Sequence, residues 1–352
     1  MLRRKLYLIV WRPTHLGAAG LVLAVSLWAD AGTPPLAGQV EVLQSVVGLP
    51  AHFVGRFGEP AGFQQASDGQ YFVFDRRGHT VSGIDRAMTA VTPLVAIGHE
   101  PGRILRPFGF DLGDGEFAVA DAPGTAERIQ VFTTSGSRLS AFMLPARSNA
   151  RVQFDGLVLN GASSMRFTAE RTVLLNQPDT GALFNEYDVT GRALRGVGTL
   201  RTTAHDGDKQ LRLALNAGLP LPIAGGGFYF VFQTGEPRFR RYDAQGVLLF
   251  ERAIQGRELD ALVQSQPTTW PERPGRSGEL PVVRPVVRVA TVDPRGYLWI
   301  SFTLPFTYVY DLDGEKVRTV QFRGAGVLMP TSLFFTRDGR LLVTPGCYVF
   351  RP

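Results

Sequence analysis

The sequence predicts an all-β fold, a six-bladed β-propeller made of four-stranded antiparallel blades. Three observations predict it. A glycine-bearing turn followed by an alternating apolar strand recurs along the chain, a second turn follows, and the copies repeat at a blade-like spacing. The composition agrees, because 40 glycines and 24 prolines in 352 residues supply many turns and favour short strands over helices.

The first recurring element is a turn that leads into an alternating apolar strand. Five copies carry a glycine in the turn: SDGQYFVFD (67–75), GDGEFAVAD (113–121), GGGFYFVFQ (225–233), PRGYLWISF (294–302) and RDGRLLVTP (337–345). A sixth copy, AERTVLLNQ (169–177), lacks the glycine but keeps the strand pattern. Glycine accepts the positive φ of tight turns, so each copy predicts a close connection between two antiparallel strands.

A second kind of turn combines an aromatic or aliphatic residue, Asp or Thr, two further residues and usually Gly. It occurs as IDRAMTAV from Ile84, FTTSGSRL from Phe132, YDVTGRAL from Tyr187, YDAQGVLL from Tyr242 and YDLDGEKV from Tyr310. An Asp side chain in this position bonds its own backbone and closes a four-residue hairpin. Each unit therefore holds four strands in a meander, which is one propeller blade.

The spacing of the units agrees with propeller blades of about 40–50 residues. Successive turns are separated by 46, 56, 56, 69 and 43 residues, measured between Gly69, Gly115, Arg171, Gly227, Gly296 and Gly339. The excess falls in three segments between blades, 145–157, 201–218 and 255–285. Within the last of these, RELDALVQSQ predicts a short helix.

The last unit has room for only three strands before Pro352. The segment HFVGRFGEP (52–60) resembles an unpaired outer strand ahead of the first complete unit. A closed ring removes the exposed sheet edges that an open array of blades would leave. We therefore expect residues 52–352 to form six blades, with the N-terminal strand completing the last blade.

The N-terminal 31 residues have the layout of a signal peptide. A basic stretch precedes the apolar run LGAAGLVLAVSLW (16–28), and ADA (29–31) supplies a small-residue cleavage site. Thirteen apolar residues are too few for a comfortable membrane span, which needs about 20. We expect export to the periplasm or the extracellular space, with 32–51 as a linker. An uncleaved N-terminal anchor is the alternative, and only then is a membrane contact expected.

Charge and cysteine content exclude several classes of protein. The formal net charge of +6 falls to about +3 without the signal segment, and the basic residues are scattered, so no nucleic-acid surface is predicted. Cys347 is the single cysteine, which excludes an intramolecular disulfide. We interpret Cys347 as a buried small apolar residue.

Two segments resemble NHL repeats. EPAGFQQASDGQYFVFDRRGHTVSGID (59–85) and GHEPGRILRPFGFDLGDGEFAVADAPGTAERIQVF (98–132) show the proline-led strand, the D-G turn, a strand ending in Val-x-Asp and a polar loop. The match is partial in the fifth and sixth units and poor in the third and fourth. The resemblance implies a six-bladed propeller of the bacterial exported type. It implies no single activity, because this family includes scaffolds, ligand binders and enzymes.

The loops between the second and third strands open on one end of the ring. In the first unit this loop is DRRGHT, with Arg76, Arg77 and His79. The Asp that begins it, Asp75, recurs as Asp121 in the second unit, so we interpret both as structural residues that tie their own loops. Arg76, Arg77 and His79 do not recur and are the candidates for binding.

The long segments between blades emerge on the same face as these loops, where function tends to concentrate. Adding their residues gives a predicted binding rim of Arg76, Arg77, His79, Arg128, Asp206 and Trp270. Polar groups that converge at the mouth of a propeller channel are suited to hold a ligand. The Pro- and Arg-rich part of 255–285 is equally typical of a flexible tether.

No motif identifies a reaction. The five histidines show no metal-binding spacing, no G-x-S-x-G marks a serine nucleophile, and the glycines at 225–227 lack the lysine and helix of a phosphate loop. The sequence therefore favours a non-enzymatic, monomeric binding protein for a peptide, a glycan or an envelope protein. The alternative is a metal-dependent hydrolase or lyase with calcium or zinc at the channel mouth; its catalytic residues are not identified.

Overall fold

The computed structural model describes residues 39–124, 126–144, 152–154, 157–159, 164–266, 272–275, 278–281 and 283–352. The chain divides into two compact units, Met1–Pro34 and Pro35–Pro352, and every described residue belongs to the second. The predicted signal segment lies outside the described residues. In the described part of the chain, no helix is long and apolar enough to cross a membrane.

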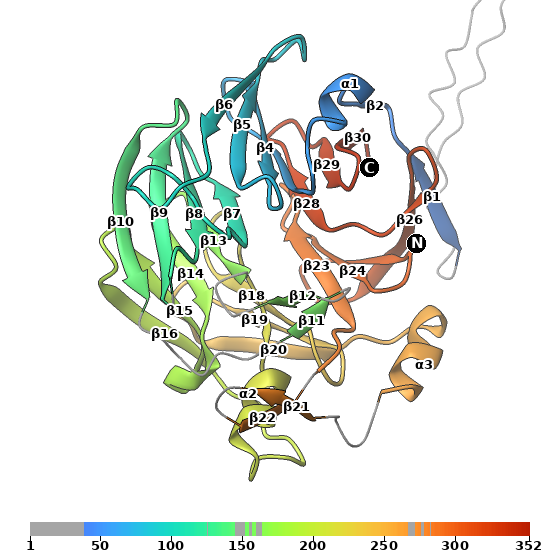
Figure 1. Ribbon diagram of the computed structural model, residues 1–352. Coiled ribbons are helices and arrows are strands. Elements are labelled where there is room, and N and C mark those ends of the chain that lie inside the picture. The colour runs from blue at the N-terminus through green and yellow to red at the C-terminus, as the bar shows by residue number, and fades with distance from the viewer. Residues whose placement is uncertain are drawn as a thin grey trace, which may run out of the picture. The chain divides into compact units, whose positions relative to one another are not determined.

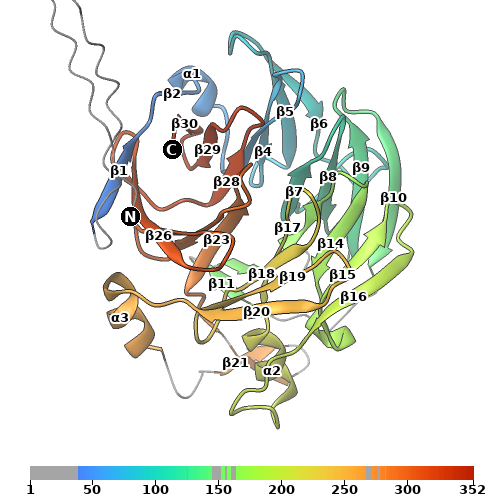
Figure 2. The same ribbon diagram turned by 180° about the vertical axis from the view of Figure 1, so that it is seen from behind.

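Six blades, each built on four antiparallel strands, are arranged around a ring, which confirms the predicted fold class (Figure 1, Figure 2). The first three blades follow the predicted repeat without interruption. Blade 1 comprises β3 (Pro60–Gln65), β4 (Tyr71–Asp75), β5 (Thr80–Ile84) and β6 (Val91–Val95); blade 2 comprises β7 (Gly109–Leu112), β8 (Glu116–Asp121), β9 (Glu127–Thr133) and β10 (Arg138–Leu144); blade 3 comprises β13 (Arg166–Phe167), β14 (Thr172–Asn176), β15 (Ala182–Asp188) and β16 (Ala193–Thr199).

The remaining three blades complete the ring, and the last one recruits a strand from the N-terminal side of the chain. Blade 4 comprises β17 (Gly218–Pro222), β18 (Phe228–Phe232), β19 (Arg238–Tyr242) and β20 (Leu248–Ala253); blade 5 comprises β23 (Val287–Val292), β24 (Leu298–Phe302), β25 (Thr307–Tyr310) and β26 (Lys316–Arg323), with β27 (Val327–Leu328) paired to β26; blade 6 comprises β28 (Ser332–Phe335), β29 (Leu341–Thr344), β30 (Tyr348–Phe350) and β2 (Val47–Gly48). The first strand of each blade contacts the first strand of the next all the way round.

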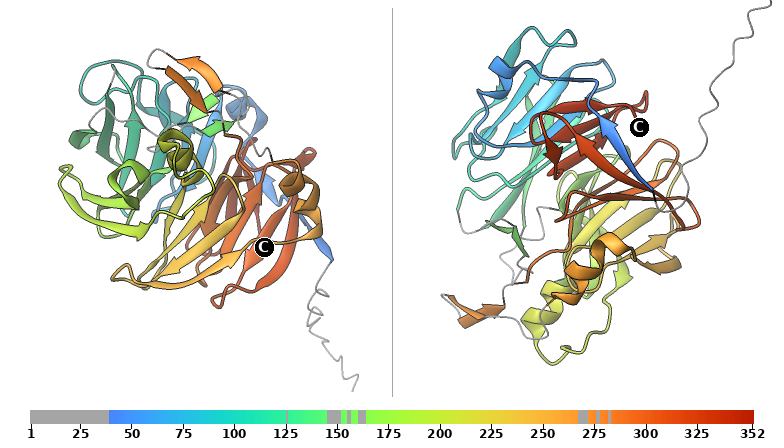
Figure 3. Two further views of the ribbon diagram at one scale, coloured as in Figure 1. Left: turned by 90° about the horizontal axis from the view of Figure 1, so that it is seen from below. Right: turned by 90° about the vertical axis from the view of Figure 1, so that its right-hand side faces the viewer.

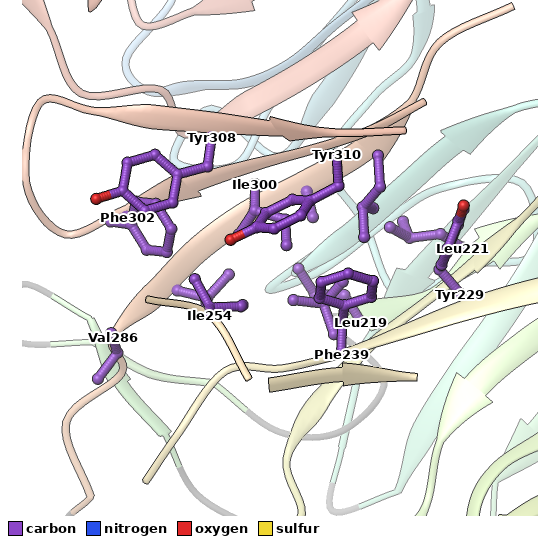
Figure 4. Close-up of a cluster of buried hydrophobic side chains, with 14 of the residues drawn as sticks. Leu219, Leu221, Tyr229, Phe239, Ile254, Val286, Ile300, Phe302, Tyr308 and Tyr310 are labelled. Atoms are coloured by element: carbon purple, nitrogen blue, oxygen red, sulfur yellow. The ribbon is translucent and has the colours of Figure 1, made fainter. Parts of the chain in front are cut away.

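Each contact between neighbouring blades holds a cluster of buried apolar side chains. A smaller cluster in the described part of the chain joins α2 (Lys209–Leu215) to Val283. Figure 4 shows the cluster between blades 4 and 5, where the ring centroids of Phe239 and Tyr310 lie 4.8 Å apart. Both faces of a blade are therefore apolar, which explains why the central strands read as continuous apolar runs. FYFVF of β18, for example, is buried at all five positions.

The predicted turn chemistry is present. Asp188 accepts hydrogen bonds from the backbone N–H groups of Thr190 (2.9 Å) and Arg192 (3.0 Å), which closes the turn between β15 and β16. In the copy without glycine, Arg171 adopts a left-handed φ of 59°, where Gly115 has 79°. The turn geometry is thus retained even where the sequence supplies a less favourable residue.

Closure by an N-terminal strand is confirmed, but the predicted segment 52–60 is wrong. The closing strand is β2, which pairs antiparallel with β30 through Val47↔Val349 and Gly48↔Tyr348. Residues after it form the short helix α1 (Ala51–Val54). The reason is Pro50, which has no N–H to continue the ladder and whose carbonyl accepts the N–H groups of Phe53 and Val54.

The region predicted as a linker, 32–51, contributes two strands in its described part. Besides β2, β1 (Val40–Gln44) pairs in parallel with β26 at the outer edge of blade 5. Arg318 on β26 anchors it with a bidentate ion pair to Glu41, with N–O distances of 2.8 Å. Blade 5 therefore carries an extra outer strand.

The long connections carry the other elements. The predicted helix appears as α3 (Arg257–Gln264), with Leu259 buried beside blades 4 and 5. The connection from blade 3 to blade 4 holds α2 (Lys209–Leu215), which lies beside the hairpin of β21 (Glu272–Gly275) and β22 (Gly278–Pro281) (Figure 3). A second hairpin, β11 (Val152–Phe154) and β12 (Leu157–Leu159), follows blade 2, and a 3-10 turn (Pro178–Thr180) follows β14.

The substitution Gly115→Ala tests the first recurring turn. A Cβ atom there meets nothing within 4 Å, so only the positive φ opposes it, and we expect unfolding free energy to fall by about 1 kcal/mol. Urea unfolding followed by tryptophan fluorescence measures the change. Gly326→Ala is the matched control, because its Cβ also meets nothing but its φ is not left-handed. Equal effects of the two substitutions would contradict this account of the turn.

Candidate functional site

A cavity of about 520 Å³ occupies the centre of the ring. Every blade contributes to its wall through its first strand: Gln64 of β3, Asp111 of β7, Arg166 of β13, Leu219 of β17, Val289 of β23 and Ser332 of β28. The cavity is therefore a product of the closed ring and belongs to no single blade. Its volume falls in the range of about 300–1,000 Å³ that is usual for ligand pockets.

The cavity extends to the loop-bearing face. Glu59, in the connection into blade 1, lines it together with Arg76, Gln233 and Pro345, which follow the second strands of blades 1, 4 and 6. These loops and connections lie at the same end of the channel, as the meander requires. This end is the mouth of the cavity.

A buried polar network ties the walls of three blades together. The Asp111 carboxylate accepts the Gln64 amide (3.0 Å) from blade 1 and the backbone N–H of Phe167 (2.8 Å) from blade 3. The Gln64 carbonyl accepts the N–H of Leu112 at 2.7 Å. Burial raises the pKa of the Asp111 carboxyl above its usual value, and the charge of Arg166 and these hydrogen bonds oppose the shift.

Arg166 reaches across the channel. Its guanidinium donates to the carbonyl of Met165 and, from blade 3, to the carbonyl of Ala290 in blade 5, both at 3.2 Å. A second arginine, Arg288, lines the cavity from the start of β23. Blades 3 and 5 thus each contribute an arginine to the channel wall.

The loop that follows β4 is held by Asp75. Its carboxylate accepts the backbone N–H groups of Gly58 (2.8 Å), Glu59 (2.8 Å) and Gly78 (2.9 Å), which is the loop-tying geometry expected of it. Arg76 forms an ion pair with Glu59 and lines the cavity. The Asp75 contacts therefore position both charged residues of the mouth.

The other two candidates of this loop lie beside the mouth. Arg77 is exposed, and it packs its side chain over Gly58. His79 is half-buried with a left-handed φ of 52°, and its Nδ1 atom is buried with no hydrogen-bond partner among the described residues. Neither residue lines the channel cavity.

The predicted rim residue Arg128 is buried at 8% exposure and bonded to Asp121, whose exposure is 0%. Its Nε and Nη2 atoms donate to the carboxylate at 2.9 and 2.6 Å, and further N–H groups donate to the carbonyls of His99 and Arg103. Asp121 also accepts the N–H of Leu105 at 2.9 Å. The Arg128–Asp121 pair thus connects the loops of blade 2. Arg128 is buried inside the blade and does not lie on an exposed rim.

The remaining rim candidates come from the long connections. Asp206 is exposed and accepts the N–H and hydroxyl of Thr203 at 2.9 and 3.0 Å, which lowers the pKa of its carboxyl. Its neighbours Thr203 and His205 line a separate cavity of about 600 Å³ beside blade 4. Trp270 lies outside the described residues. Of the described rim candidates, Arg76 alone lines the channel cavity.

The sequence interpretation missed the residues inside the channel: Gln64, Asp111, Arg166 and Arg288. A signal exists for two of them. Asp111 interrupts the apolar stretch FGFDL, and Arg288 interrupts VVRVA, each within the first strand of a blade. A charged residue inside an apolar strand that lies nearest the axis is a candidate for the channel wall.

No metal-binding centre is found in the part of the chain that the structure describes. There, no group of three or more His, Cys, Asp or Glu side chains is placed to hold a metal ion. Cys347, the single thiol, is fully buried against the contact of blades 6 and 1, and burial raises its pKa to about 12. It lies away from the channel wall.

No protein-family model matches the chain, and none of the curated proteins compared with it matches. Several solved structures align with the chain. A catalytically inactive virginiamycin B lyase from Staphylococcus aureus, solved with quinupristin, aligns with TM-score 0.50 and 11% identity over 83% of this chain and 93% of that chain. A streptogramin B lyase aligns with TM-score 0.48 and 11% identity over 84% and 93%, and BamB from Moraxella catarrhalis with 0.42 and 13% over 83% and 84%.

The alignment with the virginiamycin B lyase agrees with the six-bladed β-propeller that the sheets define. At 11% identity it shows the shared fold alone. The chemistry of the site has to be argued from the residues of this chain. The NHL type of the repeat stays a prediction.

The substitution Asp111→Asn tests the buried network. Asn offers only one acceptor to two donors, so we expect a loss of about 1–3 kcal/mol of stability. In the wild type the raised pKa makes the native state bind this proton more tightly, so stability falls as pH rises above about 4. The Asn side chain does not titrate, so the variant lacks this pH-dependent contribution to stability. Its deficit should therefore be largest near pH 4 and shrink toward pH 7 in urea unfolding.

Asp85→Asn is the control with the opposite sign. Asp85 is half-buried, and hydrogen bonds from Ala90 and Thr89 lower the pKa of its carboxyl. Its stabilisation is present above the unfolded pKa and is lost as pH falls, so the deficit of Asp85→Asn should grow with pH. A deficit of Asp111→Asn that also grows with pH would show that its carboxylate is stabilising, against this account.

Proposed function

We propose that this protein is an exported binding protein that holds its ligand in the central channel through the loop-bearing face. The observation that carries the proposal is the preformed cavity of about 520 Å³, lined by all six blades and open at the loop end. Rigid walls of this kind hold a ligand without a large ordering cost. We take the repeat to be of the NHL type, in keeping with the patterns in blades 1 and 2.

The chemistry of the wall supports a ligand that is part polar and part apolar. Phe74, Phe110 and Phe334 supply apolar surface, whereas Gln64 and Arg166 supply donors. Pockets with mostly apolar walls and a few converging polar groups are typical of specific ligand sites. A side chain of a peptide, a sugar unit or a small metabolite fits the space.

The mouth supports selection of the ligand by contact beyond the cavity. The tied loop of Asp75 presents Arg77 and His79 next to the channel, and long connections with α2 and α3 enter and leave blade 4. Residues on loops held by a rigid scaffold are well placed for recognition. We take residues 1–31 to be an export signal, so the binding activity is proposed to act outside the cytoplasm.

The substitution Thr291→Trp tests whether ligands bind in the channel. Thr291 is half-buried on β23 and lines the cavity, so an indole there fills space that a ligand needs. We expect N-phenylnaphthylamine, a neutral fluorescent probe, to bind the wild type with one site and to lose at least about tenfold in affinity in the variant. Fluorescence titration measures both.

Thr92→Trp is the matched control, because Thr92 is exposed on the outer strand β6. Its affinity for the probe should equal that of the wild type. Circular dichroism and thermal unfolding establish that both variants are folded. If folded Thr291→Trp retains wild-type affinity, the probe binds outside the channel and the proposed function is wrong.

A further inference from the structure

A second cavity lies toward the other end of the ring axis. It has a volume of about 420 Å³ and is lined by the turns between the first and second strands of blades 1, 2, 3 and 6, among them Ser67, Asp114, Ala169 and Arg337. These turns lie at the end of each blade opposite to the loops that follow the second strands, because the strands of a blade form a meander. We call this space the turn-end cavity, and the cavity of about 520 Å³ the mouth cavity. The ring therefore encloses space toward both ends of its axis.

The mouth cavity and the turn-end cavity approach one another closely. Consecutive residues line the mouth cavity and the turn-end cavity on three first strands: Gln64 and Gln65 on β3, Asp111 and Leu112 on β7, and Arg166 and Phe167 on β13. One residue advances a strand by only about 3.3 Å. A single layer of side chains therefore separates the two cavities.

One part of this layer is polar and is fixed by hydrogen bonds. The Asp111 carboxylate accepts the side-chain amide of Gln64 at 3.0 Å, and the Gln64 carbonyl oxygen accepts the backbone N–H of Leu112 at 2.7 Å. Asp111 also accepts the backbone N–H of Phe167 at 2.8 Å. These groups are buried, so a ligand that displaced them would leave polar atoms without partners, at a cost in affinity.

The other part of the layer is the ring of Phe334 on β28. Of the described residues, Phe334 alone lines both cavities. Its side chain is half-buried and packs against the apolar cluster between blades 6 and 1, which includes Phe63 and Leu342. Close packing of this kind holds a ring in place. Phe334 therefore forms an apolar floor of the mouth cavity.

A floor of this kind limits the length of a ligand that enters from the mouth. Burying one further methylene group along an apolar wall raises affinity by about fourfold. A group that reaches the floor has to displace the Phe334 ring from the cluster that holds it, and this loss offsets the gain. Affinity is therefore expected to rise with ligand length only until the mouth cavity is filled.

We propose that Phe334 determines the length of the ligand, and that the ligand enters with an apolar end that rests on this ring. The inference rests on the proposed function and adds a specificity-determining residue to the same cavity. The ligand is thus a molecule with an apolar inner end, and it is no longer than the mouth cavity is deep.

A series of N-alkyl-1-naphthylamines with butyl, octyl and dodecyl chains tests the floor. These neutral fluorescent probes differ in chain length alone. In the wild type, we expect affinity to rise with chain length and then to level off. Phe334→Ala joins the two cavities, so its affinity should continue to rise, and its ratio of dodecyl to butyl affinity should exceed the wild-type ratio at least about tenfold. Fluorescence titration measures each affinity.

Phe335→Ala is the matched control. Phe335 follows Phe334 on β28, is half-buried, and lines the turn-end cavity but not the mouth cavity. It packs against Trp299 with ring centroids 5.3 Å apart, so its truncation also removes core packing. The dependence of its affinity on chain length should equal that of the wild type. Circular dichroism establishes that both variants are folded. Phe334→Leu, for which a smaller rise in the ratio is expected, provides the test if the alanine variant does not fold.

Three outcomes would overturn the inference: a wild-type affinity that rises through the whole series, a folded Phe334 variant that levels off as the wild type does, or an equal change in Phe335→Ala. Each leaves the proposed function standing as long as Thr291→Trp excludes N-phenylnaphthylamine. If Thr291→Trp retains wild-type affinity for that probe, both proposals are wrong. The response of Thr291→Trp therefore distinguishes a failure of the length limit from a failure of the ligand site.

Discussion

The short ladder between β2 and β30 is the constraint on which the rest of the structure depends. Beyond the paired residues, the N–H of Val46 donates to the carbonyl of Val349 at 2.8 Å, and the N–H of Leu49 to that of Cys347 at 3.0 Å. Leu49 packs into the apolar cluster between blades 6 and 1, where Phe63 and Leu342 are also fully buried. The ladder therefore supplies the outer strand of the last blade and ties its edge to residues about 300 positions earlier in the chain. Without this ladder, the edge of blade 6 is unpaired. Its contact with blade 1 also loses the packing of Leu49.

The cavity follows from this closure. Its wall consists of the first strands of all six blades, so the position of each wall residue depends on both neighbouring blades. The bonds from Gln64 and Phe167 to Asp111 fix three adjacent strands, and the Arg166–Ala290 bond connects blade 3 to blade 5. These polar contacts between blades cost desolvation, and the apolar clusters further out supply the stabilisation that offsets it. The channel thus combines a rigid outline with a wall of mixed polar and apolar side chains.

The sequence was sufficient to predict the blades because local turn chemistry and apolar alternation repeat. It was sufficient even for the irregular turn at Arg171, because the following strand pattern identifies the position. The backbone of Arg171 adopts the left-handed φ that glycine has in the other copies. It was insufficient for the closing strand, because Val47 and Gly48 owe their pairing to β30, far away in sequence, whereas 52–60 has the stronger local pattern. For the same reason the predicted rim included Arg128, whose partner Asp121 is identified only by the fold. Channel residues such as Arg166 share no local motif, since the ring alone brings them together.

The central claim is that the channel enclosed by the six blades is the ligand site. The most direct measurement is the anomalous scattering of iodine in crystals soaked with para-iodobenzoate, which has one carboxylate and a flat apolar body. The account predicts an iodine peak inside the cavity near Phe110 and Phe334. Iodine peaks confined to the outer surface of the blades, with the channel free of the soaked compound, would contradict it.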